Sequence, residues 1–123
     1  MKPISTRAHG VLDYLTAGTL LALPRMMGWG PGATRLLTNA AIGTLVYSLL
    51  TRYELGLVKK LPMKGHLALD GMSGALLCVA PFLLLDEDEG DATGPLVGLG
   101  LFEIVVPLLT QTTPRGLLES GRQ

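Results

Sequence analysis

The sequence predicts an all-α fold, a four-transmembrane-helix bundle built from two tandem two-helix repeats. The segment HGVLDYLTAGTLLALP, which begins at His9, aligns with HLALDGMSGALLCVAP, which begins at His66, after a shift of 57 residues. The shift superposes the two histidines and also Asp13 on Asp70, which indicates a tandem duplication. In addition, the mean hydropathy is +0.42 and 16% of the residues are charged. Soluble domains usually contain about 25% charged residues, so this composition favours a membrane protein.

The length of 123 residues predicts a single membrane domain over residues 1–123. Repeat one covers about 4–55 and repeat two about 61–112. The net charge is zero and no basic cluster alternates with aromatic residues, so nucleic acid is not an expected partner. The single cysteine, Cys78, lies in an apolar run and is expected to be buried as a small hydrophobic side chain.

The first predicted hairpin consists of helices at about 5–27 and 34–55. Ser5 is a typical helix N-cap, and the turn between the helices is the glycine-rich segment 28–32. Each helix has about 20 residues, which at 1.5 Å per residue spans a hydrocarbon core of about 30 Å. Every span has to include ionisable side chains, because no uncharged run reaches the 18 residues typical of a membrane helix.

The second predicted hairpin consists of helices at about 63–85 and 93–112, and Pro62 marks the start of the first of them. The acidic segment 86–91 is predicted to be the turn between these helices. Its charged side chains are expected to be solvated, as is usual for a charge run in a turn.

The distribution of basic residues predicts the orientation in the membrane. Four crossings place both termini and the 56–62 loop on one side. Eight basic residues belong to that side: Lys2, Arg7, Arg52, Lys59, Lys60, Lys64, Arg115 and Arg122. Only Arg25 and Arg35 fall on the other side. The positive-inside rule therefore predicts a multi-pass protein of the cell (inner or plasma) membrane with cytoplasmic N- and C-termini.

Five ionisable residues are predicted to form a polar layer within the membrane. Helical spacing places each histidine one turn from an aspartate on the same face. The two repeats run in parallel, so the two pairs lie at matched depth near the cytoplasmic side, and Glu103 on the fourth helix lies at a similar depth. The layer consists of His9, Asp13, His66, Asp70 and Glu103. Such side chains in membranes usually face the bundle interior.

Three interpretations of this layer are open. In the structural one, His donates to Asp within a helix or between the repeats, and Glu103 accepts a hydrogen bond from Arg, Lys or Thr. In the second, a metal ion or haem binds, with His9, His66, Asp13 and Asp70 as candidate ligands. In the third, the carboxylates relay protons or ions. The structural interpretation is preferred and implies no cofactor.

A two-helix unit with Asp near its start and a Pro-aromatic segment closing its first helix resembles the SPW-repeat family of small bacterial membrane proteins. In that family the first helix of each unit ends in Ser-Pro-Trp. Here the corresponding positions are Leu23-Pro24-Arg25, with Trp29 a turn later, and Ala80-Pro81-Phe82. The resemblance covers residues 4–110, including YELGLVKKLPMKGHLALD. It implies membrane residence and a four-helix, two-repeat build, and it implies no biochemical activity.

These observations predict a non-enzymatic membrane protein of structural or accessory type. The sequence contains no nucleophile with a base, no phosphate-binding loop and no CxxC motif. Gly94 and Gly98 form a GxxxG motif, with Gly100 beside it, and predict a close helix contact within the bundle or between protomers. The expected partners are the lipid bilayer and either further copies of the chain or a larger membrane complex. The alternative is a small proton- or metal-handling transporter that uses the His/Asp/Glu layer.

Overall fold

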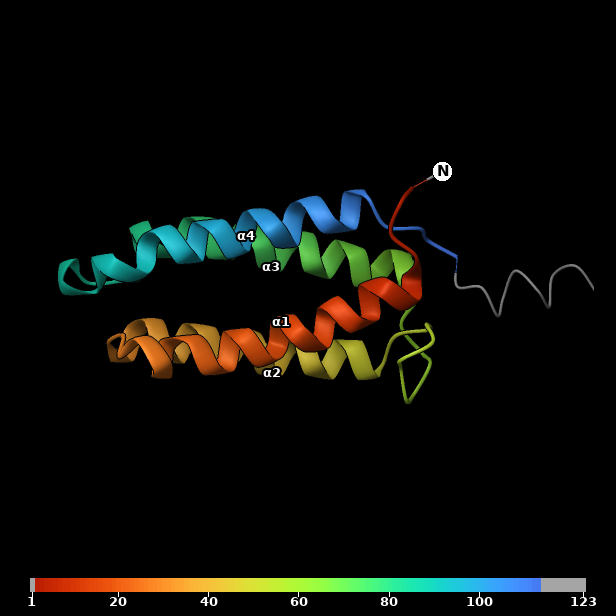
Figure 1. Cartoon of the computed structure of the whole chain (residues 1–123), viewed down its shortest axis with the longest axis horizontal. Helices are drawn as coiled ribbons and strands as arrows, with labels where there is room; N and C mark the ends of the chain where they lie inside the picture. Colours follow the sequence, from red (N-terminus) through yellow and green to blue (C-terminus); the bar gives the residue numbers. More distant parts are fainter. Residues whose placement is uncertain (1, 114–123) are drawn as a thin grey trace, which may run out of the picture.

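The computed structural model describes residues 2–113, which fold as two helical hairpins lying side by side (Figure 1). The first hairpin consists of α1 (Thr6–Met27) and α2 (Pro31–Leu49), and the second of α3 (Met63–Leu83) and α4 (Thr93–Leu108). A short 3-10 helix, η1 (Glu87–Ala92), precedes α4. The described residues contain no strand, so the predicted all-α class is confirmed.

The helix starts follow from local sequence. Ser5 is the N-cap of α1, where its Oγ accepts a hydrogen bond from the Ala8 backbone N–H at 3.1 Å. Pro62 is the N-cap of α3, as predicted. α1 ends at Gly28, whose φ of 66° is the left-handed conformation that glycine adopts without strain. α2 begins at Pro31, earlier than predicted, because proline is well suited to the first helical position.

Two predicted helices end four or more residues earlier in the structure. α2 ends at Leu49 instead of residue 55, and α4 ends at Leu108 instead of residue 112. In both cases the chain after the helix forms an isolated parallel bridge with the segment that precedes another helix, Thr51 with Leu61 and Thr110 with Ile4. The backbone groups used in these bridges cannot also continue the helix.

The two bridges have the same hydrogen-bond pattern. The bonds run from Leu61 N–H to Leu50 O (2.7 Å) and Arg52 N–H to Leu61 O (2.7 Å), and from Ile4 N–H to Leu109 O (3.1 Å) and Gln111 N–H to Ile4 O (2.8 Å). Both bridges lie at the end of the bundle where α1 and α3 begin (Figure 1). The start of each hairpin is therefore tied to the end of the other.

The interior is apolar at one end of the bundle and polar toward the other. The apolar core packs Leu20, Leu37, Leu77 and Leu96 from all four helices, with small alanines between them. Nearer the bridges, the buried residues are mostly polar or charged. Many large apolar side chains are exposed on the outer faces of the helices. Two helical segments, Met63–Leu83 and Glu87–Leu108, are long and apolar enough to cross a membrane.

Two glycines bring α3 and α4 into close contact. A Cβ atom on Gly100 would lie 2.5 Å from the Gly74 carbonyl oxygen, and one on Gly74 would lie 2.5 Å from the Gly100 carbonyl oxygen. By contrast, a Cβ atom on Gly94 or Gly98 would meet nothing within 4 Å. The contact inside the bundle is therefore made by Gly100 and not by the GxxxG pair. Cys78, expected to be buried, is only half-buried beside this contact, where its thiol donates to Val97 O at 3.7 Å.

The acidic turn is only partly solvated, which corrects the prediction for this segment. Glu89 is 7% exposed, and its Oε1 accepts a hydrogen bond from the Ala33 backbone N–H at 3.0 Å, at the start of α2. A Cβ atom on Gly30 would lie 2.5 Å from the carboxylate, and one on Gly32 would lie 2.4 Å from it. The absence of side chains at these two glycines therefore leaves room for the Glu89 carboxylate. Helix N-termini attract negative charge, and Glu89 thereby links the hairpins at the end opposite the bridges.

Candidate functional site

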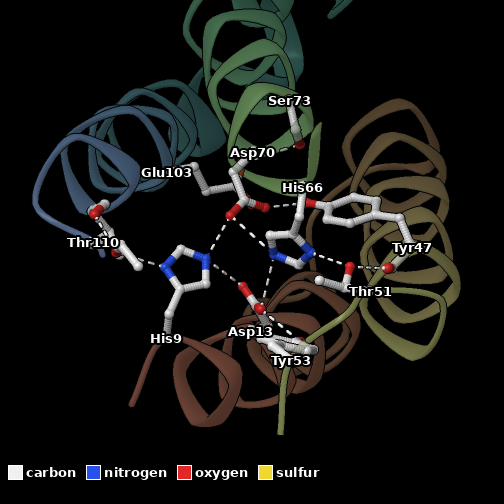
Figure 2. A network of polar contacts seen from close by, with 11 residues as sticks. His9, Asp13, Tyr47, Thr51, Tyr53, His66, Asp70, Ser73, Glu103 and Thr110 are labelled. Atoms are coloured by element: carbon white, nitrogen blue, oxygen red, sulfur yellow. Dashed lines mark hydrogen bonds and ion pairs between the residues drawn. The ribbon is translucent and has the colours of Figure 1, made fainter. Parts of the chain in front are cut away.

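Four of the five predicted polar residues come together in the interior. His9 and Asp13 lie one turn apart on α1, and His66 and Asp70 occupy the same arrangement on α3. None of the four is more than 5% exposed. One ligand atom from each residue lies within 4.8 Å of the other three. Histidines and aspartates alternate around a common centre (Figure 2), and we call these four residues the His/Asp cage.

Each imidazole of the cage faces both carboxylates. His9 Nε2 lies 2.7 Å from Asp70 Oδ2 and 3.1 Å from Asp13 Oδ1. His66 Nε2 lies 2.9 Å from Asp13 Oδ2 and 3.3 Å from Asp70 Oδ2. For each histidine the shorter contact is to the aspartate of the other hairpin. The cage therefore joins α1 to α3 across the interface between the hairpins.

A threonine holds the outer nitrogen of each histidine. His9 Nδ1 lies 2.8 Å from Thr110 Oγ1, and His66 Nδ1 lies 2.7 Å from Thr51 Oγ1. Both threonine hydroxyls donate their single proton to the carbonyl four residues earlier, at 2.7 Å for Thr110 and 2.5 Å for Thr51. The threonine oxygens must then accept from Nδ1–H. Each ring thus carries a proton on Nδ1 and presents Nε2 to the carboxylates.

This arrangement is compatible with two states of the cage, which differ in whether Nε2 carries a proton. If Nε2 of both rings also carries a proton, two imidazolium and two carboxylate groups sum to zero net charge and form a closed ion-pair network. If Nε2 is unprotonated, two nitrogen lone pairs and two carboxylates converge, and a cation is needed between them. Both states satisfy the requirement that buried charges be balanced.

Two tyrosine hydroxyls donate hydrogen bonds to the carboxylates of the cage. The Tyr47 hydroxyl donates to Asp70 Oδ1, and the Tyr53 hydroxyl donates to Asp13 Oδ2 at 2.8 Å. Burial, together with the negative charge of Asp13, raises the pKa of Tyr53 above its ordinary value, so this phenol stays a donor. Tyr53 lies in the 50–62 segment, which folds back onto the helices and brings the hydroxyl to the cage.

Glu103 lies beside the cage and is not a member of it. The side chain is 5% exposed, and Oε2 accepts a hydrogen bond from Ser73 Oγ at 3.1 Å. The expected partner was Arg, Lys or Thr, and that expectation was wrong because a serine of α3 lies closer in the packed interior. Glu103 lines a cavity of about 10 Å³ together with His9, Asp13 and Asp70. Such a cavity has room for about one water molecule.

Sequence reasoning missed Thr51, Thr110 and Tyr53. The two threonines could have been found, because the pattern Val-x-x-Leu-Leu-Thr occurs at 46–51 and again at 105–110. This second match has a shift of 59 residues, not 57, so a fixed shift does not align it. Tyr53 has no counterpart in the second repeat, and nothing in the pattern around it indicates the contact with Asp13.

Comparison with protein-family models, with curated proteins and with solved structures found no match. The resemblance to the SPW-repeat family therefore stays a prediction.

Proposed function

We propose that the chain is a small, non-enzymatic, multi-pass membrane protein of structural or accessory type, in which the His/Asp cage clamps two membrane-spanning hairpins together. The observation that carries the proposal is the inverted distribution of side chains. Charged and polar groups fill the interior at one end of the bundle, beside the apolar core, whereas large apolar side chains cover the outside. In water this arrangement would be unfavourable, and in lipid it is the expected one.

The proposal that all four helices span the membrane is supported by their outer faces and their lengths. Exposed apolar residues occur on every helix: Val11 and Leu15 on α1, Ile42 and Val46 on α2, Met72 and Leu76 on α3, and Leu101 and Val105 on α4. At 1.5 Å per residue the helices are about 24–33 Å long. This range compares well with a hydrocarbon core of about 30 Å.

The two-repeat build is supported by features that recur in both halves. Each half contributes one His/Asp pair to the cage. Each half also supplies the threonine that contacts the histidine of the other half, Thr110 for His9 and Thr51 for His66. The two terminal bridges, each of which joins one half to the other, also have the same hydrogen-bond pattern. These paired contacts are what a duplicated hairpin closing on its copy would produce.

For the orientation, we propose cytoplasmic termini and a cell-membrane location. The segment before α1, the 50–62 segment and the end of α4 share one end of the bundle (Figure 1). Six of the eight basic residues that favour this orientation are described there, and Arg115 and Arg122 lie outside the described residues. The opposite end bears the acidic η1 segment.

Cysteine labelling tests the orientation. Glu87 is exposed in η1, so a cysteine there should react with a membrane-impermeant maleimide added outside intact cells. The substitution is made in a Cys78→Ser background, and Lys59→Cys, at an exposed position of the 50–62 segment, is the matched control on the other side. Lys59→Cys should react only after the membrane is opened. Labelling of Glu87→Cys only after opening would contradict the orientation.

We also propose that the protein assembles with itself or with a larger membrane complex. Gly94 and Gly98 leave open space on the surface of α4, which permits close approach of another helix in lipid. Native mass spectrometry of the full chain released from detergent measures this association, and a monomer lacking any co-purifying subunit would contradict it.

The second candidate function is a small proton- or metal-handling transporter. It is favoured by the position of Glu103 beside a cavity that also contacts the cage. A groove of about 220 Å³ between α1 and α4 adjoins this cavity, since Leu12, Thr16 and Phe102 line both. Carboxylates beside such a route could relay protons or ions.

Flux measurements in proteoliposomes separate the two functions. For a structural protein we expect proton and Zn²⁺ flux equal to that of protein-free vesicles. A transporter would instead give flux that Glu103→Gln and Asp70→Asn abolish while the chain remains folded. Asp88→Asn, in the exposed acidic turn, is the control. Flux that requires Glu103 would contradict the structural role and establish the second candidate.

A further inference from the structure

We propose that the His/Asp cage binds one divalent transition-metal ion, with Zn²⁺ the best fit, through Nε2 of His9 and His66 and one carboxylate oxygen each of Asp13 and Asp70. The proposal goes beyond the structural role, because clamping of the hairpins requires only that the cage be electrically balanced. It is carried by the direction of the ring nitrogens, the spacing of the four ligand atoms and the hydrogen bonds around them.

The first step is the direction of the histidine nitrogens. Thr51 and Thr110 hold the Nδ1–H groups, so the nitrogen left for a ligand is Nε2 on both rings. His66 is fully buried, and its Nε2 makes no directed hydrogen bond within the described residues, although Asp13 Oδ2 is only 2.9 Å away. A buried nitrogen that is close to carboxylates but not aligned with them is suited to share a cation with them.

The second step is the spacing of the ligand atoms. Zn²⁺ lies about 2.0–2.2 Å from histidine nitrogen and carboxylate oxygen in tetrahedral sites, so its ligand atoms are about 3.3–3.6 Å apart. The two histidine Nε2 atoms lie 2.7 and 3.3 Å from Asp70 Oδ2, and His9 Nε2 and His66 Nε2 lie 3.1 Å from Asp13 Oδ1 and 2.9 Å from Asp13 Oδ2. One ligand atom from each residue lies within 4.8 Å of the other three, so side-chain shifts of about 1 Å would suit four-coordinate binding.

The third step is the set of groups that orient the ligands. Metal-binding histidines usually donate their other N–H group to an acceptor, and metal-binding carboxylates usually accept further hydrogen bonds. Thr51 and Thr110 supply the acceptors, while Tyr47 and Tyr53 donate to the two carboxylates. All four ligand residues are thus held in place by side chains that do not themselves face the centre.

The ligand set and its charge determine the class of metal. Two imidazoles and two carboxylates suit Zn²⁺ and related first-row dications, whereas Ca²⁺ and Mg²⁺ prefer oxygen ligands in larger number. Cu⁺ prefers sulfur, and the cage contains none. Two carboxylates neutralise a dication, which avoids a net charge in the interior.

Metal titration of the full chain in detergent tests the proposal. After treatment with a chelator, the protein is equilibrated with Zn²⁺ or Co²⁺ and desalted, and the bound metal is measured by mass spectrometry. We expect one metal ion per chain. Asp13→Asn and Asp70→Asn should each weaken Zn²⁺ binding by tenfold or more. Thr51→Val and Thr110→Val, which alter orienting groups, should weaken it by about 10- to 100-fold.

Asp88→Asn is the control, since Asp88 is exposed in the acidic turn at the end of the bundle opposite the bridges. This variant should retain one metal ion per chain at unchanged affinity. Absence of stoichiometric metal in the wild-type protein would overturn the proposal, and so would equal affinity in wild type and both aspartate variants.

A measurement on the wild-type protein alone covers the case in which the variants fail to fold. Bound Co²⁺ absorbs strongly in the visible range when four-coordinate and weakly when octahedral. Strong absorption that Zn²⁺ displaces is expected, and a weak octahedral spectrum would overturn the proposal. The melting temperature of the metal-free protein is recorded separately, because it tests the clamping role and not the metal site.

Discussion

Replacement of Asp70 by alanine is expected to lower the free energy of unfolding in detergent by about 3–5 kcal/mol, as when one partner of a buried ion pair is removed. The carboxylate contacts both cage histidines and accepts the Tyr47 hydroxyl. Its loss leaves the buried Tyr47 hydroxyl without its acceptor and leaves both histidines with Asp13 as their only carboxylate. Thermal or denaturant unfolding, followed by circular dichroism, measures the change.

Three further variants give this prediction its controls. Asp13→Ala should be destabilising by a comparable amount, because Asp13 also contacts both histidines and a tyrosine hydroxyl. Asp70→Asn should be milder, since the amide oxygen still accepts a hydrogen bond. Asp88→Ala, in the exposed turn, should change stability by less than about 0.5 kcal/mol. A melting temperature for Asp70→Ala equal to that of wild type would refute the clamping role.

Gly100→Ala is expected to lower the free energy of unfolding by about 1–3 kcal/mol through overpacking. The added Cβ would lie 2.5 Å from the Gly74 carbonyl oxygen and 2.9 Å from the Cys78 backbone nitrogen. Both are backbone atoms, so relief requires α3 and α4 to move apart. Gly74→Ala should act in the same way, because its Cβ would lie 2.5 Å from the Gly100 carbonyl oxygen.

Gly98→Ala is the matched control, two residues away on the same helix. Its Cβ would meet nothing within 4 Å, so stability should stay unchanged or rise by up to about 1 kcal/mol from the better helix propensity of alanine. The two variants in α4 thus differ in the sign of the expected effect. Equal effects of Gly98→Ala and Gly100→Ala would show that close packing of α3 on α4 does not stabilise the bundle.

Much of the helical framework was predictable because its causes are local. Ser5 and Pro62 mark helix starts through capping and backbone restriction, and the structure places both where expected. Helical periodicity also placed each histidine one turn from its aspartate on a common face. The ends of α2 and α4 were predicted too late, since what stops them is pairing with Ile4 and Leu61, and no local pattern shows that pairing.

Local sequence features were enough to predict that the chain is helical, that its two halves carry matching His/Asp pairs, and that charged groups occur inside apolar segments. The packing of the two hairpins brings His9 closer to Asp70 than to its own neighbour Asp13, and it places Glu89 at the start of a helix of the other hairpin. Tyr53 reaches Asp13 in the same way, from a segment predicted as helix. These contacts join residues 40 to 61 positions apart. They depend on how two hairpins pack against each other, whereas capping and periodicity depend on neighbours within one or two helical turns.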